Sequence, residues 1–273
     1  MNLAGQIKTF VFDKTGTLTE EGLSVYGVRP IDVNAGAEVT FAQLNKDLTS
    51  LMPRDRLWIQ AENAAETRNH RRTLMAEAMA SCTAIAYVDG TLVGDPLDVK
   101  MFEATGWDLH EAPEDGSLAE VCPPDQRPGQ GNFSSALLKR FEFSAPLQRM
   151  SVICNNRIDG NSCKAFVKGS PEAVTRLCVR ESIPADFRDV LHLDSQAGYR
   201  VIAIAYKEMP IDWHPDKETS RAEVESDLTF LGLLIMENKL KPITKQIIEK
   251  LKSAEVEPIM ATGDNVLTAI SVA

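Results

Sequence analysis

"FVFDKTGTLTEEG" occupies residues 10–22 and says more about the architecture than any other short stretch. It continues the apolar run "IKTFVF" of residues 7–12, whose aromatic and β-branched residues predict a buried strand. The strand ends at Asp13, and small or β-branched residues follow it. In a parallel α/β sheet, ligands bind beyond the carboxyl ends of the strands, where small residues let the backbone curl around them. Asp13 therefore stands where a ligand is expected.

A carboxylate in this position has a specific chemistry. It can attack phosphorus and become an aspartyl-phosphate, one of the recognised covalent intermediates. Two negative groups then approach each other, so a bound Mg²⁺ is expected to screen them. For an isolated Asp-x-Thr we would prefer the simpler interpretation that Asp13 only caps a turn.

The composition of the 273 residues limits the possible partners. A net charge of −10 argues against nucleic-acid binding, which needs a basic face, and against a polybasic membrane anchor. The five cysteines have no zinc-ligand spacing, which predicts free thiols in a reducing compartment. The longest apolar run, residues 228–236, is far shorter than the roughly 20 residues of a membrane helix. We expect a soluble, cytosol-facing chain that can still bind a phosphate compound locally.

The order of the predicted elements indicates an α/β protein with two kinds of sheet. Its last part alternates strand, helix, strand and helix, which predicts parallel strands with crossover helices. Its middle part, with hairpin turns at Asp89-Gly90 and Asp159-Gly160, predicts an antiparallel sheet. Residues 22–72 are expected to be irregular apart from a weak strand, and 108–135 to be a long surface loop. The expected strands are 7–12, 38–41, 137–143, 149–156, 164–167, 199–206, 228–235 and 256–261, and the expected helices are 73–85, 96–105, 170–177, 184–198, 242–255 and 265–273.

The unbroken heptapeptide "DKTGTLT", residues 13–19, resembles the phosphorylation motif of the P-type ATPases. Further segments resemble motifs of that family: "GDPLD" (94–98), "FEFS" (141–144), "KGSPE" (168–172), "GYRVIAIAY" (198–206) and "TGD" (262–264). Longer matches resemble the type V, branch B ATPases, which are linked to polyamine export from endosomes and lysosomes: "MAEAMASC", "GDPLDVKMFEATGW", "FEFSAPLQRMSV" and "MENKLKP". The resemblance covers nearly the whole chain apart from residues 27–70 and 108–135.

The resemblance implies an α/β fold of two domains. Residues 1–24 and 233–273 would form a discontinuous and incomplete Rossmann-like phosphorylation domain of the haloacid-dehalogenase type. Residues 25–232 would form an inserted α/β nucleotide-binding domain built on an antiparallel sheet. ATP and Mg²⁺ are the implied cofactors. The implied partners are a transported cation and the actuator and membrane domains of a parent protein in an endosomal or lysosomal membrane.

The resemblance also implies roles for single residues of the nucleotide site. Phe143 would stack on adenine, and Arg149 would replace a lysine of the family. Lys168 would project towards phosphate from a rigid helix start, beside a backbone that Gly169 leaves open. Asp95 and Asp98 keep two interpretations, contact with the adenine amino group or water-bound Mg²⁺, and charge at a helix start. The implied nucleotide-binding residues are Asp95, Asp98, Phe143, Arg149, Lys168, Gly169, Arg200, Thr262, Gly263 and Asp264.

The same comparison assigns the phosphorylation chemistry. The residues implied in catalysis are Asp13, Lys14, Thr262 and Asp264, and those implied in Mg²⁺ binding are Asp13 and Thr15. Asp264 is alternatively the N-cap of the last helix.

The sequence also departs from the family pattern. Asn238, Lys239, Leu240 and Lys241 stand where an aspartate, two prolines and an arginine are usual. A later lysine and a "GDGxND" loop are not found, so we expect a fragment that binds ATP weakly and does not turn it over. Two rivals stay open. A soluble phosphatase of the same superfamily would usually carry an aspartate at position 15, where this chain has Thr15, and the other rival is a non-catalytic nucleotide-binding module.

Overall fold

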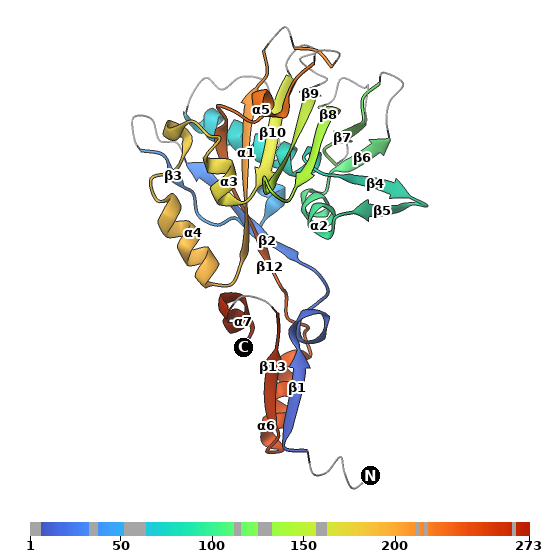
Figure 1. Cartoon of the computed structure of the whole chain (residues 1–273), viewed down its shortest axis with the longest axis vertical. Coiled ribbons are helices and arrows are strands. Elements are labelled where there is room, and N and C mark those ends of the chain that lie inside the picture. Colours follow the sequence, from blue (N-terminus) through green and yellow to red (C-terminus); the bar gives the residue numbers. More distant parts are fainter. Residues whose placement is uncertain are drawn as a thin grey trace.

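The computed structural model describes residues 7–32, 38–51, 64–111, 116–124, 133–156, 163–210, 213–215, 218–263 and 266–273. The expected turn at Asp159-Gly160 and the side chain of Asp264 lie outside them. Figure 1 shows a large sheet with its helices, from which a narrow stalk extends. In the part of the chain that is described, no helix combines the length and the apolar character needed to cross a bilayer.

Nine of the described strands form the large sheet, and each is antiparallel to its neighbours. In sheet order they are β3 (Thr40–Phe41), β2 (Ser24–Asp32), β12 (Thr229–Glu237), β11 (Arg200–Glu208), β10 (Cys163–Gly169), β9 (Arg149–Asn156), β8 (Ser135–Ser144), β7 (Ala119–Cys122) and β6 (Asp108–Glu111). A separate hairpin pairs β4 (Ile85–Val88) with β5 (Thr91–Gly94). Its turn residues, Asp89 and Gly90, both have positive φ, as the predicted Asp-Gly turn requires.

Helices cover both faces of the large sheet. On one face, α1 (Ala64–Ser81) and α2 (Pro96–Thr105) pack over a core that includes Phe166. On the other face lie α3 (Pro171–Thr175), α4 (Phe187–Gln196) and α5 (Arg221–Val224). A strand buried on both sides is apolar at every position rather than at alternate ones. This explains β12, where seven consecutive residues from Phe230 are buried.

The stalk is a small parallel unit. Its strands β1 (Thr9–Asp13) and β13 (Glu257–Ala261) pair in parallel, which agrees with the prediction from the alternating pattern. The helix α6 (Thr244–Ser253) precedes β13, and α7 (Val266–Val272) follows it. No residue of α6 is buried, although its apolar residues share a face as predicted.

Three strands and one helix were missed from sequence. The strand β2 lies in a region expected to be irregular, because "SVYGVRPID" contains glycine and proline and lacks alternation. Its Gly27 admits a neighbouring segment, since a Cβ there would lie 2.6 Å from the carbonyl oxygen of Asn45. The expected loop over 108–135 is also wrong in part, because the four-residue strands β6 and β7 lie within it. The helix α5 is a single short turn without apolar periodicity.

The cysteines are free thiols, as predicted. Cys154 and Cys163, which flank the expected hairpin turn, do not face each other. The register pairs Cys163 with Asn155 and Cys154 with Lys164, so the two thiols point to opposite faces of the sheet.

Candidate functional site

Asp13 lies at the carboxyl end of β1, and its side chain is exposed. Its register partner in β13 is Ala261, so Thr262 and Gly263 directly follow the neighbouring strand. The parallel pairing therefore brings three of the predicted site residues to one edge of the stalk. In Figure 1 this edge faces the large sheet.

The loop after Asp13 turns sharply. Thr15 has an extended backbone (φ −78°, ψ 126°), whereas Gly16 adopts a left-handed conformation with φ 76°. The turn closes at Thr19, whose backbone N–H donates to the carbonyl oxygen of Lys14 at 3.1 Å. This reversal, which the positive φ of Gly16 makes possible, leaves Thr15 and Thr17 exposed beside Asp13.

Lys14 points away from this exposed edge. Its side chain is fully buried and donates from Nζ to the Asn238 side-chain oxygen at 2.6 Å, in the amide orientation that satisfies both Asn238 atoms. The Asn238 amide nitrogen in turn donates to the carbonyl oxygen of Gly22 at 3.3 Å. The structure thus places Lys14 in the connection between stalk and sheet.

The chain crosses between the two parts twice, and the crossings are joined by backbone hydrogen bonds. The Glu20 N–H donates to the Lys239 carbonyl at 2.8 Å, and the Lys241 N–H donates to the Leu18 carbonyl at 3.1 Å. The Lys241 ammonium also donates to the carbonyl oxygen of Gly16. The two backbone bonds use the carbonyl of Lys239 and the N–H of Lys241, which a proline and an arginine at these positions would also supply. The departure from the usual sequence therefore leaves these bonds unchanged.

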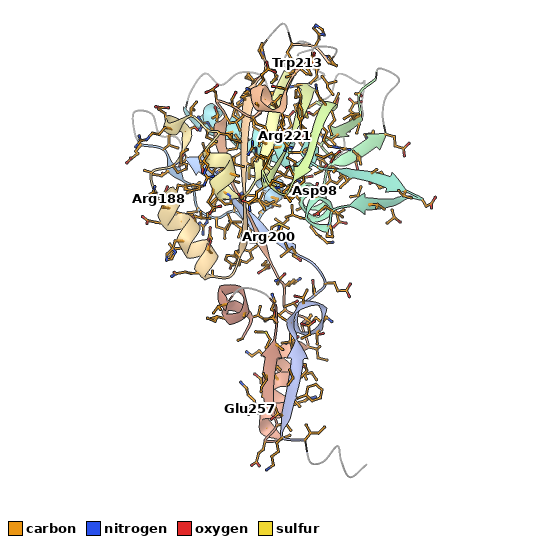
Figure 2. All side chains as sticks on the ribbon, in the orientation of Figure 1. Asp98, Arg188, Arg200, Trp213, Arg221 and Glu257 are labelled. Carbon is orange, nitrogen blue, oxygen red and sulfur yellow. The ribbon has the colours of Figure 1, made fainter. Side chains whose placement is uncertain are left out.

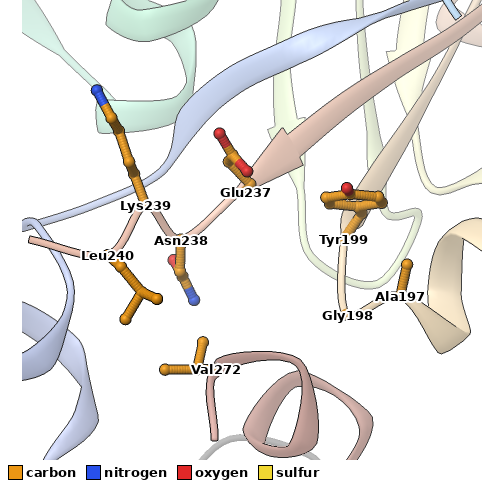
Figure 3. Close-up of a pocket in the computed structure, with 8 residues that line it drawn as sticks. All are labelled: Ala197, Gly198, Tyr199, Glu237, Asn238, Lys239, Leu240 and Val272. Carbon is orange, nitrogen blue, oxygen red and sulfur yellow. The ribbon is translucent and has the colours of Figure 1, made fainter. Parts of the chain in front are cut away.

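A cavity of about 200 Å³ lies beside the crossings (Figure 3). It is lined by Ala197, Gly198, Tyr199, Glu237, Asn238, Lys239, Leu240 and Val272. Burial raises the pKa of Glu237 and also the pKa of Tyr199. The lining residues place the cavity between α7 and the turn that precedes β11.

The edge of the stalk that carries Asp13 can be tested for its fit to Mg²⁺. The Asp13 carboxylate and the oxygens of Thr15 are hard donors of the kind that Mg²⁺ prefers, and this ion usually keeps several waters. Among the residues that the structure describes, no three carboxylate, imidazole or thiol side chains converge on one point. The Mg²⁺ site expected at Asp13 and Thr15 stays a prediction, with two exposed oxygen-bearing side chains at this edge.

Lys168 and Asp98 form a buried ion pair in the large sheet. Lys168, at the end of β10, is 5% exposed and donates from Nζ to one oxygen of Asp98. The other Asp98 oxygen accepts from the Ala84 N–H at 2.9 Å. The expected projection of Lys168 into an open pocket is thus not seen, because the neighbouring carboxylate holds the ammonium. Asp95 caps α2 by accepting from the Leu97 N–H at 2.9 Å, which is the helix-start interpretation.

The structural role of Gly169 differs from the expected one. Its backbone is not left open, since a Cβ would lie 2.4 Å from the Gln148 carbonyl oxygen and 2.6 Å from the Arg149 Cβ. The glycine therefore lets β9 and β10 approach closely. The helix start that follows is as predicted, with the Ser170 hydroxyl accepting from the Ala173 N–H at 3.2 Å.

Two further predicted residues are accessible. Phe143, near the end of β8, is 62% exposed, and Arg200 is exposed at the start of β11. In Figure 2, Asp98 and Arg200 lie on the side of the large part nearer the stalk, whereas Glu257 lies at the far end of the stalk. An exposed aromatic ring is free to stack on a base.

Arg149 is engaged within the protein. Its Nε donates to Glu225 at 2.6 Å, and Glu225 also accepts from Arg221 and from the Ser151 hydroxyl, both at 2.8 Å. Sequence analysis did not predict this cluster, which is formed around Arg149 by Glu225, Arg221 and Ser151. The one local signal was the capping box formed by Ser220 and Glu223, which marks the start of α5.

Comparison with known proteins gives consistent matches. A family model described as "P-type ATPase, cytoplasmic domain N" matches residues 106–243. The vacuolar cation-transporting ATPase YPK9 of Saccharomyces cerevisiae is 36% identical over 300 residues, covering 100% of this chain and 20% of that protein. The probable cation-transporting ATPase 13A4 of Mus musculus is 41% identical over 283 residues, covering 100% of this chain and 21% of that protein. The polyamine-transporting ATPase 13A3 of Homo sapiens is 36% identical over 298 residues, with 100% and 22% covered.

These matches confirm the resemblance that the motifs predicted. The chain spans about a fifth of the length of these relatives.

Proposed function

Because the chain belongs to the P-type ATPase family, we propose that its large sheet binds ATP and that Asp13 accepts the γ-phosphoryl group. The observation that carries this proposal is the exposed Asp13 carboxylate at the carboxyl end of a parallel strand pair, on the edge that faces the sheet. Since the chain matches about a fifth of its relatives, the complete activity is proposed for the parent protein.

On the large sheet, Phe143 would stack on the adenine ring. Lys168 and Arg200 would balance the charge of the phosphates. Lys168 is held by Asp98 in the structure, so its ammonium would exchange this partner for a phosphate oxygen. A lysine suits such an exchange because its ammonium is a point charge with three rotatable donors.

At the stalk, an oxygen of the Asp13 carboxylate attacks the γ-phosphorus. The bond between this phosphorus and the oxygen bridging to the β-phosphate breaks, and ADP leaves with the electron pair of that bond. Thr262 donates a hydrogen bond to a phosphoryl oxygen, and Gly263 keeps the loop narrow. Asp13 and Thr15 would hold Mg²⁺, which screens the charge of carboxylate and phosphate when bound.

We further propose that the stalk belongs to the haloacid-dehalogenase-type phosphorylation domain of the parent, expected over residues 1–24 and 233–273, with the nucleotide domain inserted between the two segments. Residues 233–237 are part of β12 and lie in the large sheet, so the second stalk segment begins after them. Two relatives are named as cation-transporting and one as polyamine-transporting, so a polyamine or another cation is the proposed cargo. The proposed location of the parent is an endosomal or lysosomal membrane.

The test measures binding and phosphorylation separately. Calorimetry of the chain with ATP should show binding that the Phe143→Ala variant weakens. Incubation of the parent protein with Mg²⁺ and ATP labelled in the γ-phosphate should label it in a hydroxylamine-sensitive form and leave its Asp13→Asn variant unlabelled. Binding without labelling would favour a non-catalytic nucleotide module. Cleavage of simple phosphate esters that depends on Asp13 would favour a phosphatase.

A further inference from the structure

The hairpin of β8 and β9 carries Phe143 close to its turn. Gln148 within this turn adopts a left-handed backbone with φ 53°, and its carbonyl oxygen accepts from the N–H of Ser170, the N-cap of α3, at 3.0 Å. The register between the strands also shifts between Phe141 and Ser144. The strand pairing alone therefore does not fix the end of the hairpin where Phe143 lies.

Arg221 of α5 bridges the two strands at this point. Its Nη1 donates to the carbonyl oxygen of Glu142 at 3.1 Å, and its Nη2 donates to the carbonyl oxygen of Arg149 at 2.7 Å. Glu142 directly precedes Phe143, and Arg149 is the first residue of β9. One guanidinium thus joins the strand of the exposed ring to the strand that follows the turn.

Glu225 holds this guanidinium in place. Its carboxylate is fully buried and accepts from Arg221 Nε, from Arg149 Nε and from the Ser151 hydroxyl. Both carboxylate oxygens are therefore occupied, and two cations balance the buried charge. The short helix that carries Arg221 is itself fixed by its capping box, in which the Ser220 N–H donates to Glu223 at 2.7 Å.

We propose that Arg221 and Glu225 are positioning residues that hold Phe143 in the orientation in which it stacks on adenine. This inference rests on the proposed function and adds a unit that acts through Phe143 rather than on the nucleotide. An arginine suits this position because its guanidinium presents donors on three separate nitrogens in a rigid fork, whereas the donors of a lysine all lie on one nitrogen. A lysine at position 221 would keep the charge and lose the bridge.

The first measurement needs no nucleotide. Hydrogen exchange of the backbone amides of residues 142–149 should be faster in Arg221→Met than in the wild type, and Arg221→Lys should resemble Arg221→Met. The exposed Arg188 of α4 supplies the matched control, because Arg188→Met removes an arginine without touching this hairpin. Circular dichroism checks that each variant is folded. Unchanged exchange in Arg221→Met would overturn the proposal.

The second measurement compares ligands. Arg221→Met should weaken ATP and adenosine by the same factor, about fivefold, which is the lower end of what base stacking contributes. Inorganic tripolyphosphate, which has no base, should bind as in the wild type. In a Phe143→Ala background, Arg221→Met should cause no further loss, because the ring that it positions is gone.

An equal additional loss in the Phe143→Ala background would show that Arg221 acts independently of the ring, and the proposal would be wrong. Glu225→Gln should reproduce the adenosine loss in a milder form, since the amide accepts fewer hydrogen bonds from the two arginines. A wild-type chain that binds neither ATP nor adenosine would contradict the proposed function itself. The exchange measurement uses no nucleotide, so its result tests the bridge by Arg221 separately from nucleotide binding.

Discussion

The large sheet and the stalk are built from similar residues but bury them to different extents. In the sheet, helices cover both faces, and Phe230 at the centre has no exposed surface. In the stalk, Phe10 is 44% exposed and Val11 58% exposed, although both lie on a strand as apolar as β12. The parallel pair has one helix before β13 and one after it, which leaves much of its apolar surface uncovered in the described residues.

The difference separates the part that holds most of the buried apolar surface from the part that carries the proposed phosphorylation site. Apolar burial contributes about 25 cal/mol per Å² removed from water, so the sheet holds most of the stabilising surface. The stalk contributes little of it, yet it holds Asp13 and Thr262 side by side through backbone register. Substitutions in the sheet should therefore change the free energy of unfolding. Substitutions in the stalk should instead change the position and reactivity of Asp13.

The strongest test of this contrast uses a matched pair of phenylalanines. Phe230→Ala should lower the free energy of unfolding by about 3–5 kcal/mol, because it leaves a cavity in a fully packed core. Phe230 packs edge-on against Phe41 and Phe187, with ring centroids 6.0 Å and 5.7 Å apart. Phe10→Ala in the half-exposed stalk should lower it by less than about 1 kcal/mol. Urea unfolding followed by fluorescence of Trp107 and Trp213 measures both, and equal losses would contradict the contrast.

Substitution of Lys168 should give the next largest change in the free energy of unfolding. This residue is buried in the large sheet and also belongs to the proposed nucleotide site. Lys168→Met should lower the free energy of unfolding by about 3 kcal/mol, since it leaves Asp98 buried without its cation. The double variant Lys168→Met, Asp98→Asn should recover part of this loss, because the unpaired charge is removed as well. Thermal unfolding of the three proteins checks this. A double variant less stable than Lys168→Met would show that the ion pair is not the cause.

Substitution of the same lysine should affect the affinity for ATP more than the affinity for adenosine. Lys168→Ala should weaken ATP by about 1.5–3 kcal/mol, the range for hydrogen bonds to charged groups, and adenosine by less. Calorimetry at fixed salt compares the two affinities in the wild type and the variant. An equal loss for both ligands would place Lys168 at the adenine end or in a purely structural role.

Phe143 offers a smaller effect that appears in binding alone. Its ring is exposed, so Phe143→Ala should leave the free energy of unfolding within about 0.5 kcal/mol of the wild type. ATP and adenosine should each bind more weakly by about 1–3 kcal/mol, because both ligands lose base stacking. Comparing calorimetric affinities with urea midpoints separates the two quantities. A destabilised variant with unchanged affinities would mean that Phe143 contributes to folding and not to nucleotide binding.

The sequence predicted the elements with strong local signals. The strand 149–156 was predicted with the bounds that the structure gives, and Ser170 with Pro171 marked the start of α3. The parallel edge at Asp13 also followed from the alternating pattern. What could not be predicted depends on contacts between distant segments. The strand β2 is specified by its pairing with β12 and by the hydrogen bond from Arg29 to Asp194, which lies 165 residues away in sequence. The side chain of Lys168 is held by the carboxylate of Asp98, 70 residues away.

The smallest predicted effect concerns the crossing between the two regions. Asn238 joins Lys14 to the Gly22 carbonyl through its two amide atoms. Asn238→Ala should therefore loosen the crossing and speed hydrogen exchange of residues 14–24 by a few-fold, in keeping with about 1 kcal/mol for a lost hydrogen bond. The large sheet does not use this side chain, so its urea midpoint should not change.

Lys239 is the matched control for this last prediction. It lies next to Asn238 but joins Glu20 through its backbone carbonyl, and its exposed ammonium lies 4.0 Å from the Glu20 carboxylate, where an ion pair contributes little. Lys239→Ala should therefore leave the exchange of residues 14–24 unchanged. If residues 14–24 exchange at the same rate in both variants, the backbone hydrogen bonds alone hold the stalk to the sheet. The buried Lys14 side chain would then not stabilise the crossing. If only Asn238→Ala exchanges faster, the side chain of Lys14, which directly follows Asp13, is held by Asn238, and the position of the loop after Asp13 depends on the crossing that joins it to the sheet.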